Sequence, residues 1–361
     1  MEKRKHIAFI TIFIIIDILV IGAIFWSRAK PLPTDAKITD AYFQTGYRLY
    51  LIDENGDLYV KGAKTSESIM GNSKNIWGSR PGKKFENTAF LNRNSLVTTK
   101  GDLYCWDLYP YNFEGIKKEY KKSPYKIMTN IKKSYIEVNN AKTDVLLAVI
   151  DKQDNLKIRG GVHNVDVGLD KLPSFYSEVE NMVAFSPSPE DVDQYFITKD
   201  KKLYSFNFRS NEAPQLIADD VIDAAFYSDN YLCYLTSENI LYARIYDKSV
   251  QLFNEVETFA SGDSTILIVN MSNEIEKHII KDMAGNTEKT ADIIPKTKVS
   301  KLFTNKSNDA YLGVDQKLYC YGENYIHNPG GFIFTPTWHM FDDERSQIGR
   351  DEEPAVFPNV K

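Results

Sequence analysis

Basic and aromatic side chains are interleaved in one segment of the chain, residues 108–126, with the sequence "LYPYNFEGIKKEYKKSPYK". It contains Lys117, Lys118, Lys121 and Lys122 around Tyr120. Such a cluster could bind an anionic surface, such as lipid headgroups or a wall polymer, because each lysine near an anionic membrane contributes about 1 kcal/mol. The competing interpretation is a lysine-rich loop that is simply solvated, and the sequence leaves both open.

A second segment, residues 325–354, is long and rich in aromatic residues. Trp338, His339 and Phe341 lie close together in it. Exposed aromatic side chains mark binding patches on protein surfaces. The alternative is that the segment forms outer strands and packs. The predicted binding residues are therefore Lys117, Lys118, Tyr120, Lys121, Lys122, Trp338, His339 and Phe341.

No motif of catalysis or metal binding occurs in the sequence. The five histidines lack the H-E-x-x-H spacing of a zinc site, and "GSRPGKK" from Gly78 lacks the phosphate-loop spacing. "DENGD" from Asp53 lacks the spacing of a calcium loop and is typical of a turn. We expect the acidic runs 342–345 and 351–353 to be solvated. The sequence thus predicts no catalytic residue, cofactor or metal, although paired carboxylates of a glycosidase are recognised only by their separation in space.

Composition points to a β-rich domain with a packed core. The chain has 361 residues, of which 43% are hydrophobic and 13% aromatic, and aromatic residues suit pleated strands. A net charge of −5 gives no signal for nucleic acid, which requires dense positive charge. Cys105, Cys233 and Cys320 lie in apolar, strand-like runs, so we expect buried free thiols rather than a disulfide framework.

The N-terminal region has the sequence of a membrane anchor. Residues 7–26 contain a single charge, Asp17, and end in Trp26, and a helix of that length spans about 30 Å of bilayer. We expect a cytoplasmic tail at 1–6, a transmembrane helix at 7–26, a linker at 27–37 and a folded domain at 38–361. A cleaved signal peptide is the alternative, but its apolar part is normally shorter.

The basic tail before the apolar segment favours a single-pass protein whose C-terminal domain is extracytoplasmic. Lys3, Arg4 and Lys5 precede the segment, whereas Arg28 and Lys30 follow it, so the positive-inside bias is weak. Asp17 lies near the middle of the segment, where a carboxyl costs about 2.5–3.5 kcal/mol on insertion scales. It either contacts another membrane helix or is tolerated as a protonated acid.

A hairpin pattern recurs seven times after the linker. "LVTTKGDLYCWD" from Leu96 and "YLGVDQKLYCYG" from Tyr311 are its clearest copies, each with an apolar strand, a polar turn and a Leu-Tyr pair. The aliphatic residue after each turn marks the repeat: Leu58, Leu103, Leu156, Leu203, Leu241, Ile275 and Leu318. A proline and two short apolar runs precede several hairpins, so each unit has about four strands. Such a unit, repeated at this period, is typical of a β-propeller blade.

These repeats resemble those of the regulator of chromosome condensation family, whose repeat carries an aliphatic-Thr-x-x-Gly-x-aliphatic-Tyr-x-Trp-Gly core. The resemblance covers about residues 38–361 and implies an all-β, seven-bladed propeller. The copies depart from the pattern, since the third and sixth lack the tyrosine and only the second has the tryptophan. The family's nucleotide-exchange activity is not transferred to this chain, because the family's special inserted segment is not recognisable here and an N-terminal membrane span is hard to reconcile with a nuclear, soluble role.

The two ends of the domain are expected to meet. "EPAVFPNVK" at the C-terminus resembles the segment that precedes each hairpin, and "AKITDAYFQTGYRLYLI" from Ala36 supplies its continuation. We expect the last strand and the first hairpin to complete one blade together, which would remove free sheet edges.

The sequence favours a membrane-anchored module that binds a protein or a cell-surface polymer through propeller loops. The alternatives are a carbohydrate-active enzyme, with carboxylates of perturbed pKa at one mouth of the central channel, and a structural ectodomain of a larger membrane complex.

Overall fold

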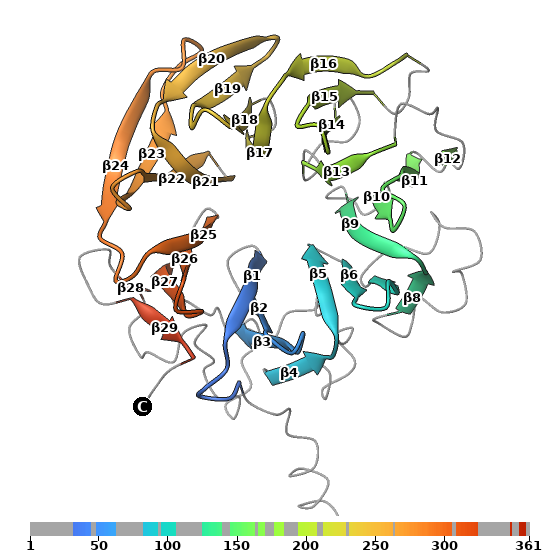
Figure 1. Ribbon diagram of the computed structural model, residues 1–361, viewed down its shortest axis with the longest axis horizontal. Coiled ribbons are helices and arrows are strands. Elements are labelled where there is room, and N and C mark those ends of the chain that lie inside the picture. Colours follow the sequence, from blue (N-terminus) through green and yellow to red (C-terminus); the bar gives the residue numbers. More distant parts are fainter. Residues whose placement is uncertain are drawn as a thin grey trace, which may run out of the picture.

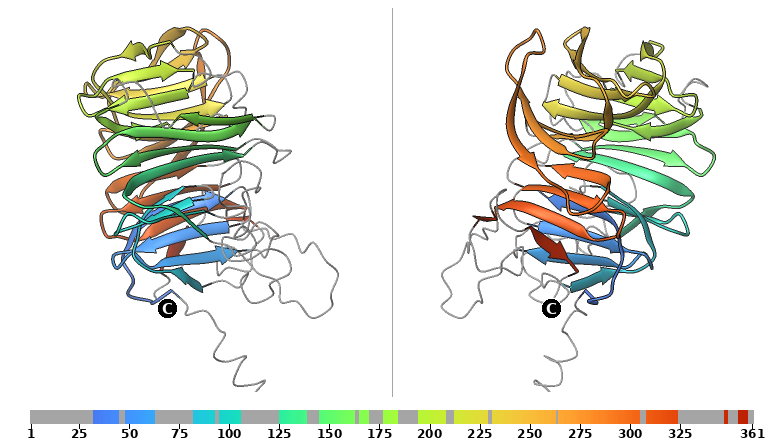
Figure 2. Two further views of the ribbon diagram at one scale, coloured as in Figure 1. Left: turned by 90° about the vertical axis from the view of Figure 1, so that its right-hand side faces the viewer. Right: turned by 60° about the vertical axis from the view of Figure 1, so that its left-hand side comes forward.

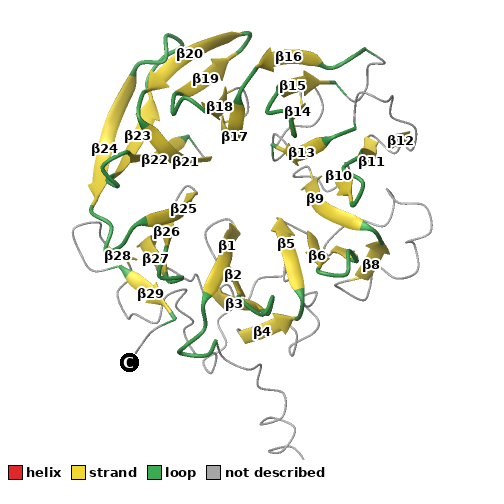
Figure 3. Cartoon of the chain, in the orientation of Figure 1, coloured by secondary structure: helices red, strands yellow, loops and turns green. Residues whose placement is uncertain are grey.

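The computed structural model describes most of the chain after residue 31. The described residues are 32–44, 48–62, 82–92, 95–105, 125–138, 145–162, 165–169, 177–183, 194–207, 212–228, 231–262, 264–304, 308–323, 347–348 and 354–358. These residues form strands, turns and loops (Figure 3).

Seven antiparallel sheets are arranged around a common centre as the blades of a propeller (Figure 1). Blade 1 consists of β1 (Ile38–Gln44), β2 (Arg48–Asp53), β3 (Leu58–Gly62) and β4 (Gly82–Phe85), and blade 2 of β5 (Thr88–Asn92), β6 (Ser95–Thr98), β7 (Leu103–Cys105) and β8 (Tyr125–Met128). Blade 3 consists of β9 (Ile131–Val138), β10 (Val145–Asp151), β11 (Leu156–Val162) and β12 (Val165–Leu169). Blade 4 consists of β13 (Val179–Met182), β14 (Gln194–Thr198), β15 (Leu203–Phe206) and β16 (Gln215–Ala218).

Blades 5 to 7 complete the ring. Blade 5 consists of β17 (Val221–Ser228), β18 (Tyr231–Thr236), β19 (Leu241–Ile245) and β20 (Lys248–Phe253). Blade 6 consists of β21 (Val256–Gly262), β22 (Thr265–Asn270), β23 (Ile275–Ile280) and β24 (Thr287–Ile293). Blade 7 consists of β25 (Val299–Thr304), β26 (Asn308–Gly313), β27 (Leu318–Glu323), β28 (Gln347–Ile348) and β29 (Ala355–Phe357). In blade 7 both β28 and β29 pair with β27. The prediction of seven blades of about four strands is confirmed.

The aliphatic residue that marks each repeat begins the third strand of its blade. All seven of these side chains are buried: Leu58, Leu103, Leu156, Leu203, Leu241, Ile275 and Leu318. The three cysteines are also buried free thiols, as predicted. Burial raises the pKa of Cys233 to about 12, so this thiol is a packing group rather than a nucleophile at neutral pH.

The turn between the second and third strands is built by the same local chemistry in blades 1 and 3. Asp53 Oδ1 accepts hydrogen bonds from the backbone N–H groups of Asn55 and Asp57, and Asp151 Oδ1 does the same for Gln153 and Asn155. Short polar side chains form such turns readily.

One turn residue in each blade has a positive φ angle. These residues are Gly56, Gly101, Asp154, Lys201, Asn239, Asn273 and Gln316.

These same residues join each blade to the next. In six of the seven junctions their backbone carbonyl accepts a hydrogen bond from the first residue of the following inner strand, as when Thr88 donates to Gly56 at 2.7 Å and Ile131 donates to Gly101 at 3.0 Å. At the junction of blades 6 and 7 the Oδ1 atom of Asn273 accepts instead, from Val299. The second-to-third-strand turns therefore all lie on one face of the ring, named here the turn face.

The ring closes by the same bond. Ile38 N–H, at the start of blade 1, donates to the Gln316 carbonyl of blade 7 at 2.8 Å. An apolar cluster across this junction contains Ile38, Leu49 and Leu51 from one side and Leu318, Cys320 and Phe357 from the other.

The predicted sharing of a blade between the two ends of the domain is wrong. The C-terminal strand β29 pairs with β27 and is an outer strand of blade 7, whereas β1 to β4 form blade 1 by themselves. The order of segments around the ring was predicted correctly. The boundary was misplaced because an outer strand and the inner strand that follows it belong to different sheets.

Candidate functional site

The predicted binding residues lie outside the described part of the chain, but the strands that carry their loops are described. Lys117, Lys118, Tyr120, Lys121 and Lys122 lie between β7 and β8, the third and fourth strands of blade 2. Trp338, His339 and Phe341 lie between β27 and β28, the corresponding strands of blade 7.

Strand direction places the strand ends that flank both loops on the same side of the ring. Because the strands of a blade are antiparallel, the connections between first and second strands and between third and fourth strands leave from the edge opposite the turn face. We name this the loop face. Figure 2 shows the blades edge-on, with the two faces on opposite sides.

The strands joined by the longest connections belong to three neighbouring blades. The three longest stretches between consecutive described strands are 63–81, 106–124 and 324–346. Each links the third and fourth strands of its blade, and the blades are 1, 2 and 7, which are consecutive around the closed ring (Figure 1). The two loops singled out by sequence thus flank blade 1 and its own long connection.

A ring of residues surrounds the centre, on the innermost strands, and six of its seven members are polar. The third residue of each inner strand occupies equivalent positions: Asp40, Phe90, Lys133, Asn181, Asp223, Thr258 and Lys301. Lys301 Nζ forms an ion pair with Asp40 Oδ1 at 2.6 Å. Lys133 Nζ lies 3.6 Å from Glu180 Oε1.

Asp223 is the unusual member of this inner ring. Burial raises the pKa of Asp223 to about 6, while a hydrogen bond from Ala224 N–H and the charges of Lys301 and Lys133 act in the opposite direction. Asp223 lies in blade 5, and the two lysines come from blades 7 and 3, neither of which is adjacent to it. Only a central position brings charges from these blades together. Carboxyls of raised pKa occur at functional sites more often than elsewhere.

Charged pairs continue outward from the inner ring on the turn face. Lys132 Nζ lies 3.0 Å from Asp154 Oδ1, and Lys199 pairs with the other oxygen of the same carboxylate. These two lysines hold the pKa of Asp154 below its usual range. The Asp154 carboxylate on this rim is therefore ionised and partnered.

A buried ion pair lies between blades 6 and 7, and sequence reasoning missed it. Lys277 Nζ on β23 contacts both carboxylate oxygens of Asp309 on β26, at 3.1 and 2.9 Å, and Thr304 donates a further bond at 2.7 Å. The two charged side chains are only 10% and 4% exposed. A signal was present, since "EIEKHII" and "NDAYLG" place a charge inside strand patterns that are apolar in most other blades.

Next to Lys277, the His278 side chain is buried on the same strand. Its Nε2 atom lies 2.8 Å from Glu276, and its ring packs 4.5 Å from that of Phe253. No hydrogen-bond partner of its Nδ1 atom lies within the described part of the chain. Among the described residues no three His, Cys, Asp or Glu side chains are grouped so that they could hold a metal ion.

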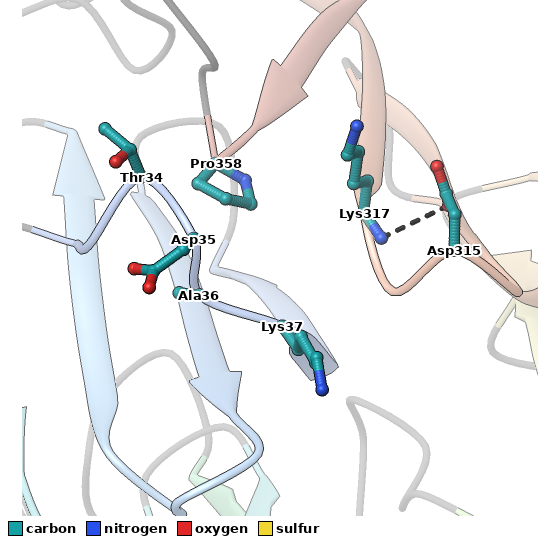
Figure 4. Close-up of a pocket in the computed structure, with 7 residues that line it drawn as sticks. All are labelled: Thr34, Asp35, Ala36, Lys37, Asp315, Lys317 and Pro358. Atoms are coloured by element: carbon teal, nitrogen blue, oxygen red, sulfur yellow. Dashed lines mark hydrogen bonds between the residues drawn. The ribbon is translucent and has the colours of Figure 1, made fainter.

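A surface cavity of about 480 Å³ lies where the chain enters blade 1. Its lining comprises Thr34, Asp35, Ala36, Lys37, Asp315, Lys317 and Pro358 (Figure 4). The cavity joins the segment that leads into β1 to the turn of blade 7, where Lys317 N–H donates to Asp315 Oδ1 at 3.3 Å. It therefore lies on the turn face, beside the junction that closes the ring.

The predicted membrane segment, with Asp17, lies outside the described residues. Within the part of the chain that is described, no helix is long and apolar enough to cross a membrane.

Comparisons with known proteins identify solved structures of low similarity. No protein-family model and no curated protein sequence matches the chain. Among solved structures, Prp20p from Saccharomyces cerevisiae, studied for its binding to Gsp1p and histones, is 12% identical with a TM-score of 0.43; the match covers 90% of this chain and 78% of Prp20p. BBS1N, solved in complex with ARL6DN, is 11% identical with a TM-score of 0.48, over 81% of this chain and 93% of BBS1N.

The N-terminal domain of Nup159 is 15% identical with a TM-score of 0.37, and the match covers 52% of this chain and 58% of that domain. At these values the likenesses assign neither a family nor a partner to this chain. Its propeller fold follows from its own seven sheets, and propellers commonly serve as binding scaffolds.

Proposed function

We propose that this protein is a membrane-anchored binding module whose loop face, in the sector of blades 7, 1 and 2, captures a protein or a cell-surface polymer. One observation carries the proposal: the three longest connections, 63–81, 106–124 and 324–346, leave from one edge of three consecutive blades. Long loops on a regular scaffold are the usual place of binding residues.

The membrane part of the proposal is supported by the sequence. Residues 7–26 are apolar over a length that spans a bilayer, and the basic tail at 1–6 favours an extracytoplasmic propeller. A lysine cluster at 117–122 and aromatic residues at 338–341 would then face away from the anchor, which enters the domain beside the turn face.

The partner's chemistry follows from the two loops. Lys117, Lys118, Lys121 and Lys122 favour anionic groups, and Tyr120, Trp338 and Phe341 offer flat apolar contacts. A partner that combines acidic groups with apolar or sugar surfaces fits both. An anionic wall polymer and an acidic protein surface share this chemistry.

Reversing two of these charges tests the proposal. We expect Lys121→Glu with Lys122→Glu to weaken capture by about 2 kcal/mol or more, roughly 30-fold, because each lysine contributes about 1 kcal/mol toward an anionic surface. The measurement is cross-linking on intact cells followed by mass spectrometry of captured partners.

The matched control is Lys201→Glu with Lys202→Glu, an adjacent lysine pair on the turn of blade 4. This control should leave capture unchanged. Equal loss of capture in both double variants would refute the assignment of the loop face.

A second candidate, an enzyme acting on cell-surface carbohydrate, is favoured by Asp223 alone. A carboxyl of pKa about 6 suits a general acid, but glycoside hydrolysis needs a second carboxylate facing the same substrate. In the described inner ring the other carboxylate, Asp40, is held by Lys301. Asp223→Asn would abolish turnover by such an enzyme, whereas a binding module would retain its partner.

A further inference from the structure

Exposed apolar side chains gather on the turn face at the junction of blades 6 and 7. Met271, Ile294 and Val314 are 58%, 89% and 57% exposed. Single exposed apolar residues are normal on protein surfaces, whereas a group of them marks an interaction site. These three are most of the large apolar side chains exposed on the turn face within the described chain.

The segments that carry these residues touch one another. Asn273, two residues after Met271, donates from Nδ2 to the Thr297 carbonyl at 3.3 Å, and its Oδ1 accepts from Val299. Val314 N–H donates to the Lys298 carbonyl at 2.9 Å. The connector 294–298 thus lies between the two turns, and Met271, Ile294 and Val314, which lie on these adjoining segments, are named the patch here.

The patch is specific to these two blades. Met271 and Val314 each occupy the first position of the turn between the second and third strands. The other five blades have polar residues there: Glu54, Thr99, Lys152, Lys199 and Ser237. The turn geometry is the same throughout, since each of these seven residues donates its N–H to the residue before its own inner strand. The apolar substitutions are therefore not required by the fold.

The chain enters the domain beside this patch. Leu32 packs against the apolar cluster that closes the ring, and residues 34–37 line a cavity together with Asp315 and Lys317 of the blade 7 turn (Figure 4). Six residue steps separate Leu32 from Trp26, the end of the apolar segment, and an extended chain spans at most roughly 20 Å over that length. An anchor at 7–26 would hold this part of the turn face close to the membrane.

Local charge does not favour an electrostatic mode of contact. Charges of both signs lie here: Lys296, Lys298 and Lys317 with Glu274 and Asp315 inside these segments, and Glu255, Glu257 and Asp292 beside them. Lys298 is moreover paired with Glu257 at 2.8 Å. Contact with a bilayer would therefore depend on apolar side chains entering the headgroup region. A short tether makes weak contact sufficient, because it raises the effective concentration of the surface.

We propose that the turn face at blades 6 and 7 rests on the lipid surface of the membrane that anchors the chain, with Met271, Ile294 and Val314 in its headgroup region. This inference rests on the proposed anchor. It orients the propeller with the turn face toward the bilayer and the loop face toward its partner.

A fluorescent probe on Ile294 tests this orientation. The full chain carrying Ile294→Cys, labelled with a nitrobenzoxadiazole dye, is reconstituted into phosphatidylcholine vesicles that contain lipids with a nitroxide at the headgroup. The three native cysteines are buried, so the introduced thiol is labelled selectively. The matched control is Met283→Cys, also exposed but in the turn between β23 and β24, on the loop face.

We expect the nitroxide lipids to remove most of the fluorescence of the probe at 294 and little of that at 283. Equal quenching at both positions in vesicles that float with the protein would overturn the orientation and leave the anchor standing. Failure of the protein to float with the vesicles would overturn both. Quenching that appears only when anionic phosphatidylglycerol is added would contradict the apolar contact. A dye shift without lipid quenching, growing with protein density, would assign the patch to a second copy of the chain.

Discussion

Replacing Asp309 with Leu is expected to lower the free energy of unfolding by about 3–5 kcal/mol, because it leaves the buried Lys277 ammonium without its counter-charge. Lys277 bonds to both oxygens of this carboxylate across the junction of blades 6 and 7. The measurement is the urea midpoint of the full chain, followed by intrinsic fluorescence at neutral pH.

The double variant Lys277→Met with Asp309→Leu should recover most of this loss. Other blades already hold uncharged side chains at these places: Val60, Ile158 and Cys320 correspond to Lys277, and Leu49, Leu147 and Leu232 correspond to Asp309. Exchanging a buried pair for packed apolar groups is often neutral or stabilising.

The matched control is a surface pair on the same blade. Lys281 and Glu288 pair with both side chains about half exposed, and such pairs contribute about 0–1 kcal/mol. Glu288→Gln should therefore shift the urea midpoint only slightly. A cost of Asp309→Leu no larger than that of Glu288→Gln would refute a structural role of the buried pair.

Asp223→Asn is expected to stabilise the protein at neutral pH by about 3 kcal/mol, since a rise of about 2 pKa units corresponds to that free energy. The pKa of Asp223 is about 6 in the folded chain. An acid whose pKa is raised on folding contributes stability below its unfolded pKa and loses it as the pH rises through the folded value. The wild type should therefore lose stability between pH 4 and pH 7, and the Asn variant should lose less.

Urea unfolding at pH 4, 5.5 and 7 measures this difference. The free energies of unfolding of wild type and Asp223→Asn should be nearly equal at pH 4, and their difference should grow as the pH rises. Asp282→Asn is a control of opposite sign, because hydrogen bonds from Asn286 and Ala284 hold the pKa of Asp282 below its usual range, so its ionised form is favoured by folding. Parallel stability profiles of wild type and Asp223→Asn would contradict the desolvation of Asp223.

A residue that reduces stability at physiological pH is unusual in a packed domain. Selection maintains stability only above a threshold, so a destabilising residue is tolerated. Such residues are found most often where they serve function, at some cost in stability. Asp223 is for this reason the residue of the inner ring whose substitution is most informative about any chemistry at the centre of the propeller.

The repeat could be predicted because every copy contains the residues that form its turn. The polar turn and the buried aliphatic residue after it recur from Leu58 to Leu318, and a turn depends only on neighbours in sequence. The positive φ angles at Gly56 and Gly101 explain why Asn-Gly and Lys-Gly pairs mark two of the turns.

The buried pair and the inner ring could not be predicted, since their partners come from different blades. Lys277 and Asp309 are 32 positions apart, and Asp223 senses lysines of two blades that are not its neighbours. The pattern of one blade does not specify which residues meet across a junction. The strands at the two ends of the domain, β29 and β1, are a similar case. Their order around the ring could be predicted from the sequence, whereas the sheet to which each belongs could not.

The most direct test of the account places a photo-reactive amino acid at Tyr120, Trp338 or Val314 in the full chain on intact cells. The first two positions lie between the third and fourth strands of blades 2 and 7, whose flanking ends are on the loop face, and the third lies on the turn face. We expect positions 120 and 338 to capture the same protein or polymer and position 314 to capture lipid. Capture of that partner from position 314, and from neither of the other two, would contradict it.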